Sequence, residues 1–181
     1  SNSFFENDLK NLLATILIIS IFTDIHKLDK NFFYDHKITN GRGDIVKVRL
    51  FKKNFYLMDE SYNSNPLSLQ SALKNLDMIK VDNTKKHLVL GDMLELGKYS
   101  KKLHIEIGKS INKTSLKNVN VIGKHVKWIF NNVNKSKKGI ILNKKSQIID
   151  LIKNILSNND YLMIKGSNST GLNSLANQIK T

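Results

Sequence analysis

The chain has 181 residues, 40% of them hydrophobic and 24% charged, which is typical of one folded domain with a smaller additional fragment. It contains no cysteine, which excludes disulfides, thiolate metal sites and cysteine catalysis and favours a cytoplasmic setting. The formal net charge of +14 would suit a nucleic-acid binder, but the lysines are scattered, Arg42 and Arg49 are the only arginines, and no nucleic-acid motif accompanies them. We therefore interpret the charge as solvated surface and expect no nucleic-acid partner.

The first 39 residues are expected to form a separate helical piece. Apolar residues at helical spacing predict a helix over residues 8–22, apolar on nearly all sides and therefore deeply buried. Its longest apolar run, residues 12–22, is about half of the ~20 residues that a membrane span needs, so we expect no span. Gly41 and Gly43 in "TNGRGD" interrupt the pattern, and we place a domain boundary between residues 39 and 40.

Residues 40–181 show the pattern of an α/β domain. The alternating segment "DIVKVRLF" and the following "NFYLM" predict two adjacent strands. From Pro66 onward, helical spacing alternates with short apolar runs at residues 87–91, 118–123, 139–142 and 161–166. This alternation predicts a Rossmann-like, mostly parallel six-stranded sheet with helices on both faces.

Three polar junctions follow predicted strands: "MDESYNSNP", "LGDMLELG" and "KGSNSTG". Because ligands bind outside the carboxyl ends of parallel strands, we expect these junctions to lie along one edge and to form a site. Asn65 and Pro66 have a structural interpretation, as the cap and first residue of a helix. Glu60 could take a ribose hydroxyl, and Tyr62 and Asn63 could contact a base or phosphate; an exposed polar turn is the alternative.

Two glycine-containing motifs do not match the pattern of a phosphate-binding loop. "GSNSTGLN" has the glycine spacing of a phosphate loop, but Leu172 and Asn173 stand where that loop needs lysine and Ser or Thr. "GDMLELGK" carries one residue too many between its glycines. The five histidines show no ligand spacing, so no metal site is predicted.

The runs "MDESYNSNPLSLQSAL", "KKHLVLGDMLELG" followed by "KKLHIEIG", and "MIKGSNSTG" resemble, in this order, the C-terminal domain of the Mur ligases. The resemblance is greatest to the members that add D-Ala-D-Ala to UDP-MurNAc-tripeptide in peptidoglycan synthesis. It implies that ATP converts the tripeptide carboxylate to an acyl phosphate, which the dipeptide amine attacks. The first helix is similar to the last helix of the family's central ATPase domain.

The resemblance also implies roles for single residues. Asn11 would contact adenine, Arg42 phosphate and Glu60 ribose, while Tyr62 and Asn63 would pack beside the nucleotide. The dipeptide and acyl phosphate would meet Asp92, Lys165 and Ser167.

Magnesium, its ligands and the phosphate loop would belong to N-terminal and central domains upstream. No catalytic residue is therefore expected within this chain, which alone should be inactive. Two positions depart from the family pattern: Glu60 replaces aspartate, and Asn168 replaces an arginine. The alternative to a ligase fragment is a stand-alone nucleotide-binding or interaction module that docks on a separate ATPase half.

Overall fold

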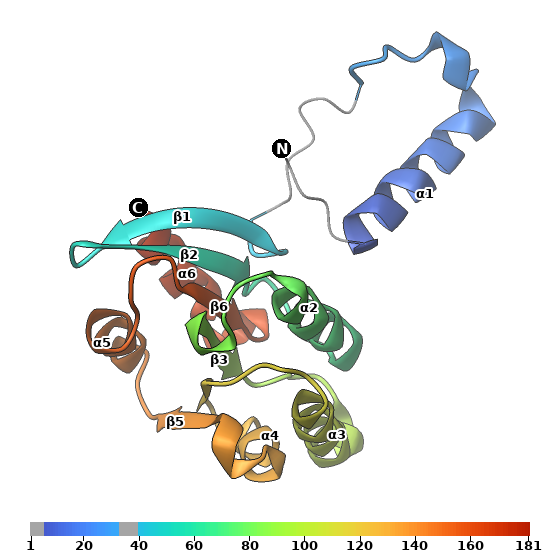
Figure 1. Ribbon diagram of the computed structural model, residues 1–181. Coiled ribbons are helices and arrows are strands. Elements are labelled where there is room, and N and C mark those ends of the chain that lie inside the picture. The colour runs from blue at the N-terminus through green and yellow to red at the C-terminus, as the bar shows by residue number, and fades with distance from the viewer. Residues whose placement is uncertain (1–5, 33–39) are drawn as a thin grey trace. The chain divides into compact units, whose positions relative to one another are not determined.

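The computed structural model describes residues 6–32 and 40–181. The chain divides into two compact units, residues 1–38 and 39–181. The smaller unit contains α1 (Glu6–Phe22) and a short 3-10 helix (Ile25–Lys27). The larger unit contains the sheet (Figure 1).

The helix predicted over residues 8–22 is present as α1, but its predicted burial is wrong. Leu17, Ile21 and Phe22 are 66%, 76% and 83% exposed, and apolar side chains emerge all round the helix. Among the described helices, none is long and apolar enough to cross a membrane.

The predicted six-stranded, mostly parallel sheet is confirmed. Its spatial order is β1-β2-β6-β3-β4-β5, and only the pair β1–β2 is antiparallel among the strand pairs of the described chain. Phe51 and Lys52 both have positive φ, as a two-residue hairpin between twisted strands requires. The strands are β1 (Asp44–Leu50), β2 (Lys53–Glu60), β3 (Lys86–Gly91), β4 (Val119–Ile122), β5 (Lys138–Leu142) and β6 (Tyr161–Lys165).

Helices cover both faces of the sheet, as the strand–helix alternation predicted (Figure 1). One face packs against α5 and α6 in a continuous apolar core that includes Phe55, Val89 and Ile164. On the other side, α3 contacts both α2 and α4. The helices are α2 (Pro66–Met78), α3 (Ser100–Asn112), α4 (Lys127–Asn132), α5 (Ser146–Asn154) and α6 (Leu172–Lys180).

The apolar spacing of α5 no longer matches burial where the helix ends. Ile155 continues the apolar spacing of α5, but the helix ends at Asn154 and the side chain of Ile155 is 50% exposed. Leu156 is buried instead. The chain turns at this point, so helical spacing no longer decides which side chain faces the core.

A buried ionic contact fixes the start of the domain beside the end of β2. Nζ of Lys180 on α6 lies 2.7 Å from Oδ2 of Asp44 and 2.6 Å from Oδ2 of the fully buried Asp59. The amide of Gly41 donates to Asp44, and the amide of Tyr62 donates to the carbonyl oxygen of Gly41. Gly41 has a φ of 78°, and a Cβ there would approach Tyr62 to 2.9 Å. The hydrogen bonds of Gly41 therefore hold the loop around Gly41 against Tyr62, in the segment that follows β2.

Candidate functional site

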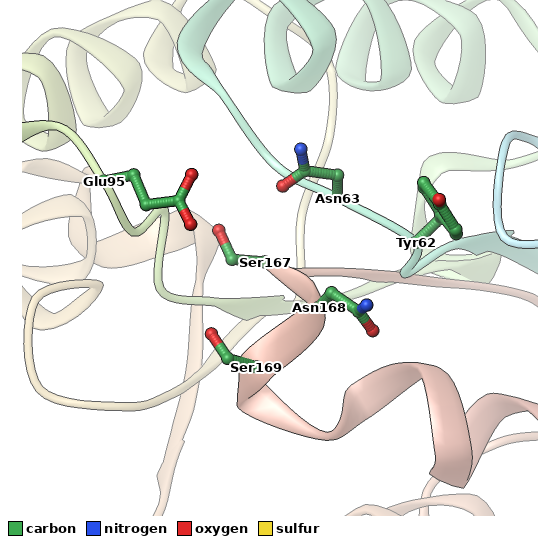
Figure 2. Close-up of a pocket in the computed structure, with 6 residues that line it drawn as sticks. All are labelled: Tyr62, Asn63, Glu95, Ser167, Asn168 and Ser169. Atoms are coloured by element: carbon green, nitrogen blue, oxygen red, sulfur yellow. The ribbon is translucent and has the colours of Figure 1, made fainter.

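The three polar junctions meet, as the parallel-sheet rule predicted. Strands β2 and β3 both pair with β6 in parallel, so the loops that follow them leave the sheet at the same edge. Together they form a pocket of about 460 Å³ (Figure 2). Its walls are Tyr62, Asn63, Glu95, Ser167, Asn168 and Ser169.

The segment after β2 is held rigidly by the start of α2. The side chain of Asn65 accepts a hydrogen bond from the amide of Ser68 at 2.9 Å, and Pro66 occupies the first turn of the helix. The structural interpretation of these two residues is thus confirmed. Asn63, two residues earlier, accepts from the amide of Ser64 at 2.7 Å through Oδ1, which leaves its amide hydrogens as donors.

Lys165 lies behind the pocket wall and is buried with a side-chain exposure of only 2%. Its ammonium lies 3.3 Å from Oε2 of Glu60 and donates to the carbonyl oxygen of Asn63 at 3.0 Å. Burial lowers the pKa of Lys165, while the carboxylate of Glu60 acts in the opposite direction. Lys165 therefore holds Glu60 and Asn63 in place and does not line the pocket.

Ser167 joins all three loops. Its hydroxyl accepts from the amide of Leu94 at 2.9 Å and donates to the carbonyl oxygen of Ser64 at 3.3 Å. Its own amide donates to the carbonyl oxygen of Asp92 at 3.0 Å. The side chain lines the pocket, with its hydroxyl hydrogen already engaged by Ser64.

Asp92 does not line the pocket. Its carboxylate accepts hydrogen bonds from the amides of Lys124 at 3.0 Å and Val126 at 2.6 Å, just before α4. Gly123 has a φ of 135°, and a Cβ there would come within 2.5 Å of Oδ1 of Asp92. The carboxylate thus ties the loop after β3 to the loop after β4.

Arg42 and Tyr62 form an exposed pair at the end of the pocket that Tyr62 lines. Cζ of Arg42 lies 4.6 Å from the ring centroid of Tyr62, which is a cation–π distance. The structure thus brings Arg42, Glu60, Tyr62 and Asn63 into one region of the larger unit. Asn11 lies on α1 in the smaller unit, where its side chain is exposed.

Sequence reasoning missed Glu95, although it lies within the "LGDMLELG" motif. Glu95 has a φ of 62°, in the left-handed region that non-glycine residues rarely adopt. Figure 2 shows its carboxylate and the hydroxyl of Ser167 pointing toward one another. Its position in the loop could have identified Glu95 from the sequence. Glu95 lies in the middle of the loop, whereas Asp92 follows the strand immediately.

His104 supports the same loop from α3. Nδ1 donates to the carbonyl oxygen of Ser100 at 2.7 Å, and Nε2 accepts from the amide of Met93 at 3.3 Å. Burial lowers the pKa of His104, opposed by the Ser100 carbonyl and by Asp92, while His125 acts with burial. Within the described residues, no cluster of histidine, aspartate or glutamate side chains could hold a metal ion.

Comparison with known proteins places this geometry in context. Residues 41–168 match the family model described as "Mur ligase, glutamate ligase domain". A UDP-N-acetylmuramoyl-tripeptide–D-alanyl-D-alanine ligase from Rickettsia prowazekii is 29% identical over 91% of this chain and 35% of the relative. The ligase of the same name from Haemophilus influenzae is 32% identical over 92% of this chain and 35% of the relative. The chain thus spans about a third of the length of these relatives.

Solved structures show the same fold. The MurF ligase from Thermotoga maritima in complex with ADP superposes with a TM-score of 0.81 at 22% identity, covering 99% of this chain and 39% of that one. MurF from Acinetobacter baumannii gives a TM-score of 0.76 at 19% identity, covering 97% of this chain and 38% of that one.

Proposed function

The chain belongs to the Mur ligase family, and we propose that it is the C-terminal part of an ATP-dependent ligase that adds D-Ala-D-Ala to UDP-MurNAc-tripeptide. The names of the curated relatives support this substrate pair. The three polar loops that carry the sequence resemblance also form one pocket in the fold. This coincidence is the observation on which the proposal mainly rests.

The proposed reaction has two steps. The tripeptide carboxylate attacks the γ-phosphate of ATP to give an acyl phosphate and ADP, and the dipeptide amine then displaces phosphate to form the amide. Both steps depend on positioning the reactants and on neutralising phosphate charge. The chain's own contribution would be to bind and orient the nucleotide and the dipeptide as the domains close.

The residues on the β2 side suit the nucleotide. Arg42 is exposed and offers a guanidinium fork to phosphate oxygens, while its stacking on Tyr62 limits its motion. The carboxylate of Glu60 is anchored by Lys165 and could accept a ribose hydroxyl. Asn63 would pack beside the nucleotide, and Asn11 would reach adenine from the preceding domain.

The contacts of the remaining candidate site residues suggest different roles for them. Ser167 lines the pocket and is assigned to the dipeptide side. Lys165 and Asp92 are assigned as positioning residues, because their polar groups bind Glu60 and the α4 loop. Magnesium would neutralise phosphate charge; the described residues lack a metal cluster, so its ligands are assigned to the preceding domain.

The test joins the chain to the coding sequence upstream of it and measures D-Ala-D-Ala-dependent ADP release with UDP-MurNAc-tripeptide. Loss of a charge-assisted hydrogen bond is worth about 1.5–3 kcal/mol, so Arg42→Ala should lower kcat/KM for ATP by about 10- to 100-fold. Arg49→Ala is the matched control, since Arg49 is exposed on β1 and far from the end of β2 in the strand register. Equal kcat/KM values for both variants would remove Arg42 from the site.

Glu60 needs a different variant from alanine. Glu60→Ala would leave the buried Lys165 ammonium without its carboxylate and would destabilise the domain as well as the site. Glu60→Asp restores the usual family residue and should keep activity near that of the parent. An upstream sequence with no phosphate loop, or a joined protein without dipeptide-dependent turnover, would instead favour the docking module.

A further inference from the structure

The charge at the Glu95 end of the pocket is opposite in sign to the net charge of the chain. The chain carries 29 lysine and arginine residues against 15 acids. Of the pocket's six wall residues in the described chain, however, none is basic, and Glu95 is the only one with a charged side chain. At the Glu95 end of the pocket an anion would therefore meet a carboxylate, whereas a cation would be attracted. The Arg42 guanidinium lies beside Tyr62, at the other end.

We propose that Glu95 binds the ammonium group of the acceptor substrate and so positions that end of the substrate in the pocket. The identification of that substrate as D-Ala-D-Ala rests on the proposed function. The binding of a primary ammonium by Glu95 rests on the pocket itself. Asp92, the acid that the motif first suggested, is excluded because both of its oxygens bind backbone amides.

The backbone around Glu95 is fixed by contacts on both preceding residues. The amide of Leu94 donates to Oγ of Ser167, and the amide of Met93 donates to Nε2 of His104. Glu95 itself is exposed at the pocket in a left-handed conformation, and no ion pair to its carboxylate is found within residues 6–32 and 40–181. Among the described residues, a carboxylate without an ion-pair partner is thus presented by a loop that two hydrogen bonds hold.

The neighbouring polar groups suit a molecule with an ammonium at one end and an acceptor at the other. The hydroxyl hydrogen of Ser167 is engaged by Ser64, so its oxygen faces the pocket mainly as an acceptor beside Glu95. Oδ1 of Asn63 is also engaged by Ser64, so its amide hydrogens are available as donors. Figure 2 shows Glu95 at one end of the pocket and Tyr62 and Asn168 toward the other. A dipeptide carbonyl or carboxylate would meet the amide group of Asn168, whereas Asn63 stays assigned to the nucleotide.

The experiment titrates the ¹⁵N-labelled 181-residue chain with D-Ala-D-Ala, N-acetyl-D-Ala-D-Ala and glycinamide, following the amide signals of residues 61–65, 93–97 and 166–170. Acetylation removes the ammonium charge and leaves the rest of the dipeptide unchanged. The test variant is Glu95→Gln, and the control is Glu106→Gln, an exposed glutamate on α3 outside the pocket. Binding of D-Ala-D-Ala should weaken about 10-fold or more in Glu95→Gln and stay unchanged in Glu106→Gln.

The outcomes separate this inference from the proposed function. Perturbation by D-Ala-D-Ala that needs Glu95 and is absent with the acetylated dipeptide supports both. Glycinamide binding that needs Glu95, without any response to D-Ala-D-Ala, supports ammonium binding and counts against the proposed substrate. Equal binding of D-Ala-D-Ala and its acetylated form, equal affinity in Glu95→Gln, or no response to any primary amine overturns the inference.

Discussion

At the scale of single residues, His104 has a defined protonation state. Its bond to the Ser100 carbonyl needs a hydrogen on Nδ1, and its bond from the Met93 amide needs a lone pair on Nε2. Both contacts exist only in the neutral Nδ1–H tautomer. A second proton on Nε2 would break the contact to Met93, two residues before Glu95.

This state predicts a pH dependence of stability. Burial sets the folded-state pKa of His104 below the unfolded value of about 6.5, so the unfolded chain binds the proton first as pH falls. The stabilisation is complete above about pH 6.5 and is lost progressively below it. Between pH 7.5 and 5.5, the urea midpoint of the larger unit should fall, and it should fall less in His104→Gln, which cannot titrate. His87, whose pKa burial also lowers, should leave a residual slope.

The control for this measurement is His26→Gln, because His26 lies in the smaller unit and its side chain is exposed. It should reproduce the parent's fall in midpoint. Parallel curves for the parent and His104→Gln would show that His104 does not titrate with unfolding.

At the scale of elements, α1 differs from the helices of the sheet domain. An isolated helix of 17 residues is marginal in water, because most helical stability in proteins comes from a packed apolar face. Helix α2 has such a face, formed by Leu69, Ala72, Leu73 and Leu76. On α1, side chains such as Leu13, Leu17 and Ile21 are instead more than half exposed.

We therefore expect amide hydrogen exchange to be fast along α1 and slow along α2 in a dilute, demonstrated monomer. Protection factors below about 100 for residues 8–22 would match a helix that opens independently of the domain. Protection that grows with protein concentration would show that α1 pairs with another copy. Slow exchange of these residues in a monomer at all concentrations would contradict the prediction.

At the scale of the whole molecule, the packing of the described residues bears on whether the glycine-spaced loop after β6 could hold phosphate. The glycine-spaced loop from Gly166 to Gly171 continues into Leu172, which is 1% exposed and packs in the apolar core. A Cβ on Gly91 would approach Leu172 to 2.6 Å, so this position is tightly filled. A lysine reaching for phosphate could not be accommodated there without disrupting the core.

The purified 181-residue chain should accordingly release no ADP from ATP above the buffer rate, with or without D-Ala-D-Ala. The physical reason is that its described residues contain neither a lysine-bearing phosphate loop nor a metal cluster. A coupled ADP assay on repurified protein provides the measurement. Turnover that persists through repurification and disappears in Glu60→Gln would contradict this expectation.

The sequence by itself determined the architecture and predicted the edge of the sheet at which the pocket lies. Alternating apolar runs and helical spacing depend on neighbours a few residues apart, so they specified the parallel sheet and its covering helices. The Asn65 cap and Pro66 depend on contacts within one turn and were predicted for the same reason. The rule for parallel strands then placed the three polar loops at one edge. A cytoplasmic setting and the absence of a nucleic-acid partner stay predictions.

Only the tertiary structure decided which loop side chains face the pocket. Lys165 and Glu60 are 105 residues apart in sequence, and Leu94 and Ser167 are 73 apart, so no local pattern records either contact. The contact with Glu60 keeps Lys165 in the interior. The loop before α4 binds Asp92, so that Glu95 is the acid of this loop that faces the pocket. Motif spacing identifies a loop, but a side chain's direction follows from hydrogen bonds that form when distant strands pack together.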